Sequence, residues 1–181
     1  MINRRIFAQV AIAALVAAPL AAQAHGPTRQ KVEITTTIDA PAAKVWAVVS
    51  NFQDLSWLAP VAKVEGTGDS TPNVAKRTIT LKNNEIIKES LEKLEADKML
   101  VFYRMDEPNL KALPVANYSS RITVKDTGDG KSSVTWWGAF YRGYENNDPP
   151  PELSDEAAVK AVTDLYTVGL AGLKAKVEGA K

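Results

Sequence analysis

The chain contains no cysteine and only one histidine among its 181 residues. Without cysteine it can form no disulfide bond and no thiolate metal site, so its fold must depend on an apolar core. The single histidine, His25, lies near the N-terminus, which argues against a Ser–His or Cys–His catalytic pair inside a domain. A metal site at this residue would need further histidines. We therefore expect no metal ion.

An excess of charge of either sign is also missing. The chain has 22 lysines and arginines against 21 aspartates and glutamates, whereas nucleic-acid binding needs a basic face. Beyond the N-terminal segment, no apolar run is long enough to cross a bilayer. No phosphate-binding loop, nucleophile motif or catalytic pair of carboxylates is recognisable. The sequence therefore predicts neither a cofactor nor a catalytic residue.

Residues 1–24 have the pattern of a secretory signal peptide. A pair of arginines precedes an apolar stretch over 6–22, and the segment AQA at 22–24 is a cleavage signal. Cleavage there would leave 25–181 as one mature domain, which we expect in the periplasm. An uncleaved membrane helix is the alternative, and the arginine pair fits either Sec or twin-arginine export.

The first part of the mature chain predicts a strand followed by short helices. Residues 32–38 alternate apolar and polar side chains, as a half-buried strand does. Pro41 suits the first turn of a helix, and apolar residues then recur at helical spacing from Val45 to Phe52. A second short helical turn is expected over 55–58, before Pro60.

The rest of the chain predicts a run of antiparallel strands and one long helix. The strands are expected at 61–64, 77–82, 85–94, 99–105, 118–125 and 133–142. Ser154 is a suitable N-cap for the helix, whose apolar stripe runs from Val162 to Val177. The economical packing is an α+β domain in which a curved antiparallel sheet wraps around the C-terminal helix.

Several segments resemble the START-like helix-grip (SRPBCC) superfamily, which includes polyketide cyclases and pathogenesis-related plant allergens. They are IDAPAAKVWAVVSNFQDLSWLAP, IIKESLEKLEADKMLVFYRM, GKSSVTWWGAF and LYTVGLAGLKAKVE. The resemblance covers roughly residues 32–178. It implies a helix-grip fold with two short helices after the first strand, and a cavity for a hydrophobic ligand between the sheet and the long helix.

Two further segments, LPVANYSSRITV and SVTWWGAFYRGYE, resemble the MxaD-type accessory proteins of methanol oxidation. That resemblance implies a non-enzymatic periplasmic protein whose partner is a periplasmic methanol dehydrogenase or its cytochrome c. The superfamily also hosts polyketide cyclases and dehydratases, so an enzyme acting in the cavity is the alternative function.

The side chains expected to line the cavity are mainly aromatic. Trp57 and Trp136 offer large apolar faces for a ring or acyl ligand, and core packing is the alternative for both. Phe140 shares a strand face with Trp136 because successive side chains alternate. The long helix contributes Tyr166 and Leu170 to the expected cavity.

Four polar residues on the strands are candidates to reach the interior: Glu89, Tyr103, Arg104 and Arg121. Of these, Glu89 and Tyr103 are predicted to line the cavity. A buried arginine–glutamate pair could orient a carbonyl group or act as acid and base. Exposed pairing between neighbouring strands is the favoured alternative for these charges.

A partner-binding surface is expected on the convex face of the sheet. Trp137 must point away from the face that carries Trp136, and Tyr141 shares its side. Exposed aromatic side chains beside Arg142 would suit a protein partner. Leu110 and Leu113, in the loop after residue 105, are the other candidates for contact with a partner.

Overall fold

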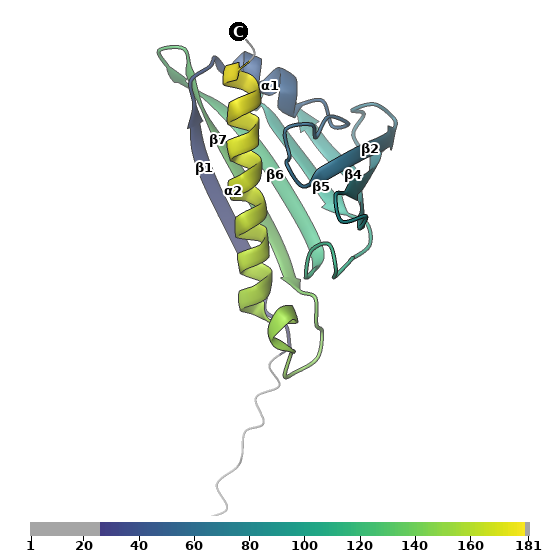
Figure 1. Cartoon of the computed structure of the whole chain (residues 1–181). Coiled ribbons are helices and arrows are strands. Elements are labelled where there is room, and N and C mark those ends of the chain that lie inside the picture. The colour runs from purple at the N-terminus through teal and green to yellow at the C-terminus, as the bar shows by residue number, and fades with distance from the viewer. Residues whose placement is uncertain (1–25, 180–181) are drawn as a thin grey trace, which may run out of the picture.

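The computed structural model describes residues 26–179, and within them a seven-stranded antiparallel sheet faces one long helix (Figure 1). In chain order the elements are β1 (Gln30–Ile38), α1 (Ala42–Val49), β2 (Val61–Thr67), β3 (Lys76–Leu81), β4 (Ile86–Glu95), β5 (Leu100–Met105), β6 (Val115–Gly128), β7 (Lys131–Arg142), η1 (Pro151–Leu153) and α2 (Asp155–Gly179). The expected signal peptide and His25 lie outside the described residues. The predicted α+β helix-grip fold is confirmed.

The strand order is β1-β7-β6-β5-β4-β3-β2, so the first strand is an edge strand beside the last one. In Figure 1, α2 runs along β1, β7 and β6, while β2, β4 and β5 lie to the side of the helix. The helix therefore covers only part of its face of the sheet. This arrangement leaves room for a cavity beside α2.

Residues that tolerate a left-handed backbone close the hairpins of the sheet. Asn84 (φ 67°) lies in the turn between β3 and β4, at the Asn-Asn pair that predicts a hairpin. Asp129 (φ 54°) lies between β6 and β7. These turns set the registers in which inward-facing residues of neighbouring strands meet.

The expected second helix after β1 does not form. Residues 55–58 make a single turn, in which the Leu58 amide donates to the Leu55 carbonyl over 2.9 Å. Pro60 has no amide proton to extend that turn into a helix. The Asp54 carboxylate accepts a hydrogen bond from the Ser56 amide (2.9 Å), which favours a turn over a helix. The chain then enters β2 directly.

The turn at residues 54–58 packs tightly against α2. Trp57 is buried, and its indole Nε1 donates to the Asp54 carbonyl over 3.0 Å. Lys176 on α2 donates to the Asp54 carboxylate (2.5 Å) and to Ser56 Oγ (2.6 Å). A β-carbon at Gly172 would lie 2.0 Å from the Trp57 carbonyl oxygen. Glycine at this position therefore permits the close approach of the turn to the helix.

Replacing Gly172 by alanine should lower the free energy of unfolding by about 1–3 kcal/mol, as overpacking does. Helix propensity alone would give the opposite sign, because alanine is favoured over glycine by about 1 kcal/mol. Ala171→Gly, at the exposed neighbouring position, measures that propensity separately. Urea denaturation of the three proteins gives both values. An increase in stability for Gly172→Ala would contradict the packing described here.

Candidate functional site

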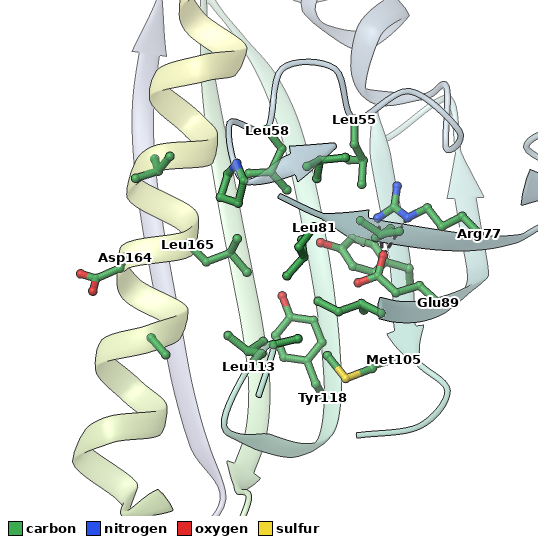
Figure 2. A pocket seen from close by; sticks show the side chains of 18 of the residues that line it. Leu55, Leu58, Arg77, Leu81, Glu89, Met105, Leu113, Tyr118, Asp164 and Leu165 are labelled. Carbon is green, nitrogen blue, oxygen red and sulfur yellow. Dashed lines mark hydrogen bonds and ion pairs between the residues drawn. The ribbon is translucent and has the colours of Figure 1, made fainter. Parts of the chain in front are cut away.

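A cavity of about 280 Å³ lies between the sheet and α2 (Figure 2). Most of its wall is aliphatic, from the turn before β2, from β3 and β4, from the loop after β5, and from α2. The helix contributes Ala161, Leu165 and Val168 to this wall. Asp164 is also near the cavity, but Figure 2 shows its carboxylate pointing away. The interior thus suits an apolar ligand of small size.

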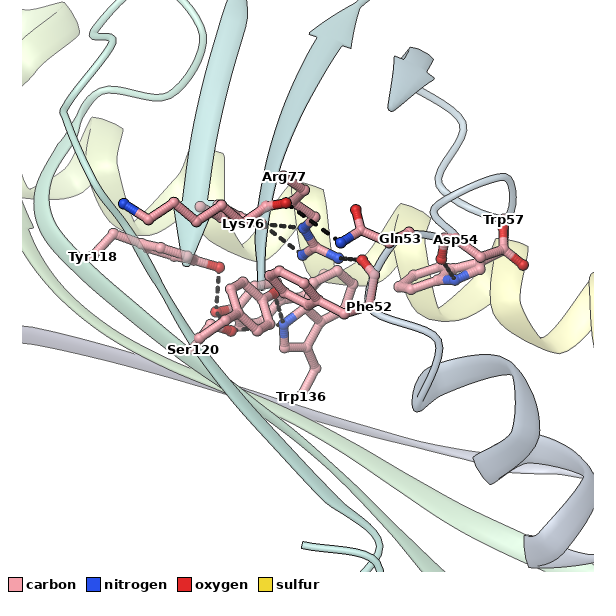
Figure 3. A network of polar contacts seen from close by, with 12 residues as sticks. Phe52, Gln53, Asp54, Trp57, Lys76, Arg77, Tyr118, Ser120 and Trp136 are labelled. Carbon is pink, nitrogen blue, oxygen red and sulfur yellow. Dashed lines mark hydrogen bonds and ion pairs between the residues drawn. The ribbon is translucent and has the colours of Figure 1, made fainter. Parts of the chain in front are cut away.

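One buried ion pair interrupts the apolar wall. Arg77 on β3 is opposite Glu89 on β4 in the strand register, and the side chains are each only 6–8% exposed. Arg77 Nε and Nη2 both lie close to Glu89 Oε2, at 2.7 and 2.5 Å. Arg77 Nη1 donates to the Phe52 carbonyl over 2.6 Å, as Figure 3 shows. The pair thereby ties the segment after α1 to the edge half of the sheet.

Aromatic rings enclose the guanidinium group. Its carbon lies 4.0 Å from the centre of the Phe52 ring and 4.9 Å from that of Tyr103. Such contacts stabilise a desolvated cation. Burial raises the pKa of the Glu89 carboxyl group, and the charge of Arg77 opposes that rise.

The second polar feature of the wall is a network of hydrogen bonds that connects β6 with α2. The Tyr118 and Tyr166 hydroxyls are 2.8 Å apart, and Tyr166 is 3.0 Å from Ser120 Oγ. Ser120 donates to the Trp137 carbonyl over 3.0 Å. Trp136 Nε1 donates to Ser120 Oγ (2.8 Å) and to Tyr103 Oη (3.1 Å). These bonds pair the polar atoms that large aromatic residues bring into the core.

Gly138 on β7 has no side chain, which allows the Tyr166 hydroxyl of α2 to approach the sheet. A β-carbon at that position would lie 2.0 Å from Tyr166 Oη. The Tyr166 ring stacks on Trp136, with centroids 4.5 Å apart and an interplanar angle of 12°. Trp136 is thus held between α2 and the cavity.

The structure divides the residues predicted to line the cavity into two groups. Glu89, Tyr103 and Trp136 line it. The others are buried in the core outside its wall: Trp57, Phe140, Tyr166 and Leu170. The two helix residues face the sheet, whereas the cavity meets the adjacent row of α2 that carries Ala161, Leu165 and Val168.

Arg77 and Tyr118 are wall residues that the sequence reasoning missed. For Arg77 a signal was present, because alternation places it on the same face as the apolar Ile79. The favoured interpretation of Glu89 as an exposed charge is wrong, since its side chain is buried against Arg77. Arg104 is exposed and Arg121 is half-buried, so neither extends this pair.

The residues predicted to contact a partner differ in how exposed they are. Trp137 is half-buried, with the Arg121 guanidinium 5.1 Å from its ring centre, and Tyr141 is half-buried. Leu110 is 36% exposed, but Leu113 is only 5% exposed and forms part of the cavity wall. Arg142, expected beside the exposed aromatics, is instead buried and pairs with Asp155 over 3.0 Å.

Within residues 26–179, no group of three or more histidine, cysteine, aspartate or glutamate side chains is placed to hold a metal ion. In the same part of the chain, no helix is long and apolar enough to cross a membrane. The candidate site is therefore the cavity with its ion pair and its tyrosines.

The buried tyrosines should make the protein sensitive to alkaline pH. Burial raises the pKa of the Tyr103 hydroxyl to about 12, and it also raises the pKa values of Tyr118 and Tyr166 above 10.0. A raised pKa favours the neutral phenol in the folded state, so this stability is present below pH 10 and is lost as the pH rises towards 12.

We expect Tyr103→Phe to lose less stability than the unmodified protein across that interval, because one fewer buried phenol must ionise. Urea denaturation at several pH values between 10 and 12 measures the two slopes. Equal slopes would show that Tyr103 ionises as readily in the folded chain as in the unfolded one.

The fold and the cavity can be compared with known proteins. The family described as polyketide cyclase / dehydrase and lipid transport matches residues 29–178. No protein of curated function matches the chain significantly. Among solved structures, the protein XoxI of Bacillus cereus is 26% identical, with a TM-score of 0.68 over 81% of this chain and 94% of that one. A protein of Nitrosospira multiformis is 25% identical, with a TM-score of 0.67 over 82% and 96%.

A more distant similarity is to norcoclaurine synthase of Thalictrum flavum, solved in complex with dopamine and hydroxybenzaldehyde. It is 18% identical, with a TM-score of 0.67 over 86% of this chain and 90% of that one, and at this identity the likeness shows the fold alone. The family match, in contrast, spans nearly all of the described residues. The chain belongs to the polyketide cyclase / dehydrase and lipid transport family.

Proposed function

We propose that this protein binds a small hydrophobic ligand in the cavity beside α2 and does not convert it chemically. The observation that carries this proposal is the apolar wall around a cavity of about 280 Å³. The charges of Arg77 and Glu89 in this wall compensate each other in an ion pair. Burying apolar ligand surface there contributes roughly 25 cal/mol per Å². Membership of a family that includes lipid-transport proteins supports the same function.

The polar groups of the wall favour binding over catalysis. Acid–base catalysis works best with a group whose pKa lies near the working pH, whereas burial raises the Tyr103 pKa to about 12. Burial raises the pKa of the Glu89 carboxyl group and Arg77 offsets only part of that rise, but the carboxylate is already engaged by Arg77 in an ion pair. We therefore place a cyclase or dehydratase activity second to binding.

Export to the periplasm is part of the proposal. It is supported by the signal-peptide pattern of residues 1–24. N-terminal sequencing of the protein isolated from a periplasmic extract tests it. The expected first residue is His25, and an unprocessed product retained in the membrane would contradict it.

A substitution that fills the cavity should weaken ligand binding. Ala161 lies in the wall on α2, so Ala161→Phe places a ring in the space that a ligand would use. We expect it to weaken binding of N-phenyl-1-naphthylamine by about tenfold or more, because each 1.4 kcal/mol of lost burial is a factor of ten. Fluorescence titration of the probe measures this.

The matched control is Ala171→Phe, at an exposed position on the same helix. It adds the same ring outside the cavity and should bind the probe as the unmodified protein does. Equal binding by both variants, or no binding by the unmodified protein, would contradict the proposed function.

A second candidate function is that of an accessory protein for methanol oxidation, which binds a periplasmic dehydrogenase or its cytochrome c. The observation that favours it is a pair of grooves on the outer face of the sheet. Their linings contain five cationic side chains (Arg29, Arg104, Arg121, Lys98 and Lys125) and two acidic ones (Glu33 and Glu92). Trp137 and Tyr141 lie among these charges. A basic surface with aromatic anchors suits an acidic protein partner.

Under this second candidate, Trp137→Ala and Tyr141→Ala should weaken electron transfer between methanol dehydrogenase and its cytochrome, with the fold intact. An anchor residue contributes about 2 kcal/mol or more, so the concentration needed for half of the effect should rise at least about tenfold. The comparison variants, Glu89→Gln and Tyr103→Phe, leave the outer face unchanged, and circular dichroism checks that Glu89→Gln, which unpairs Arg77, is folded. If these two abolished activity while the outer changes had no effect, an enzyme acting in the cavity would be the better account.

A further inference from the structure

We propose that the ligand is a neutral apolar molecule carrying a hydroxyl group, such as a phenol or an alcohol, and that Glu89 and Tyr103 bind this hydroxyl. The inference rests on the proposed binding function and assigns it a ligand class. It follows from counting which protons and lone pairs of the cavity wall are already used inside the protein.

Glu89 presents an unused acceptor. Both contacts from Arg77 go to Oε2. Oε1 has no hydrogen-bond partner among the described residues, yet it is not among their fully buried, unpartnered atoms. Since Glu89 lines the cavity, Oε1 is open to it. A ligand group that donates a hydrogen bond is the natural partner for this oxygen.

The hydrogen-bond chain fixes the direction of the other protons. The Trp137 carbonyl can only accept, so the single proton of Ser120 is directed to it. Tyr166 must therefore donate to Ser120, and Tyr118 must donate to Tyr166. The Tyr118 proton points along this chain, which leaves the Tyr118 oxygen in the cavity wall as an acceptor only.

Tyr103 is left as the donor. Its oxygen shares the single Trp136 Nε1 proton with Ser120 Oγ, and the shorter contact, 2.8 Å against 3.1 Å, is the one to Ser120. Ser120 Oγ already accepts from Trp136 and Tyr166, which uses both of its lone pairs. The Tyr103 proton is therefore available to a ligand. Because Glu89 and Tyr103 line the same cavity, the inference requires one ligand hydroxyl that accepts from Tyr103 and donates to Glu89.

The charge of the wall selects a neutral ligand. Arg77 and Glu89 compensate each other, and both are buried. A ligand carboxylate would add an unpaired negative charge beside the open oxygen of Glu89, and a buried unpaired charge is costly. An alcohol or phenol satisfies the same groups without that cost.

Three ligands of matched shape test the inference: 4-ethylphenol, 4-ethyltoluene and 4-ethylbenzoate. Binding is followed by the indole N–H resonance of Trp136, a residue in the cavity wall, assigned by comparison with Trp136→Phe. In the unmodified protein 4-ethylphenol should bind about tenfold more tightly than 4-ethyltoluene, as expected for one or two net hydrogen bonds. 4-Ethylbenzoate should bind most weakly.

Two variants locate the effect. Tyr103→Phe removes the donor, and the double variant Arg77→Met with Glu89→Leu removes the acceptor without leaving an unpaired charge. In both, the ratio of the 4-ethylphenol affinity to the 4-ethyltoluene affinity should fall most of the way towards one. Tyr141→Phe, on the outer face, is the control and should keep the ratio of the unmodified protein. Should the double variant fail to fold, Tyr103→Phe and the ligand series decide alone.

Equal binding of 4-ethylphenol and 4-ethyltoluene would overturn the inference but leave the apolar cavity as a binding site. Tightest binding of 4-ethylbenzoate would overturn it as well, because Arg77 would then be the group that receives the ligand. If none of the three bound, the proposed function itself would fail, and this inference with it.

Discussion

The buried ion pair between Arg77 and Glu89 is the interaction on which the cavity depends. It joins β3 to β4, and through the Phe52 carbonyl it joins both strands to the segment that follows α1. Removing one member of such a pair leaves an uncompensated charge in the interior, at a cost of about 3–5 kcal/mol. The same pair contributes charged groups to an otherwise mainly apolar cavity wall. Under the proposed function, Glu89 therefore contributes both to stability and to the recognition of a ligand.

The rest of the site follows from how α2 is placed on the sheet. The helix packs against β1 and β7 and leaves the inner face of β3 and β4 uncovered. Tyr166 and Trp136 fill the covered side through stacking and shared hydrogen bonds, and the uncovered side remains as the cavity. Every polar group that the aromatic residues bring into this region has a partner or faces the cavity, so the wall is preorganised before a ligand enters.

Much of this fold could be predicted from sequence, because alternation in the strands and the apolar stripe of the last helix are local signals. The existence of each strand follows from such patterns, whereas the inward direction of the face of β7 that carries Trp136 comes from the family resemblance. The row of α2 that borders the cavity does not, since it depends on the angle at which the helix crosses the sheet. Likewise, alternation puts Arg77 and Glu89 on an inner face, but their pairing depends on the register set by the turn at Asn84. Alternation predicts that a charged residue in a half-buried strand is exposed, and the tertiary pairing of Glu89 with Arg77 overrides that rule.

The central claim is that the space between α2 and strands β3 to β6 is a ligand site. A crystal structure of the protein with N-phenyl-1-naphthylamine tests it most directly. The account predicts electron density for the probe in the cavity, in contact with Leu165 on the helix and Tyr103 on the sheet, with the Arg77–Glu89 pair unbroken. Probe density confined to the outer face near Trp137, or a cavity closed by collapse of its wall, would contradict it.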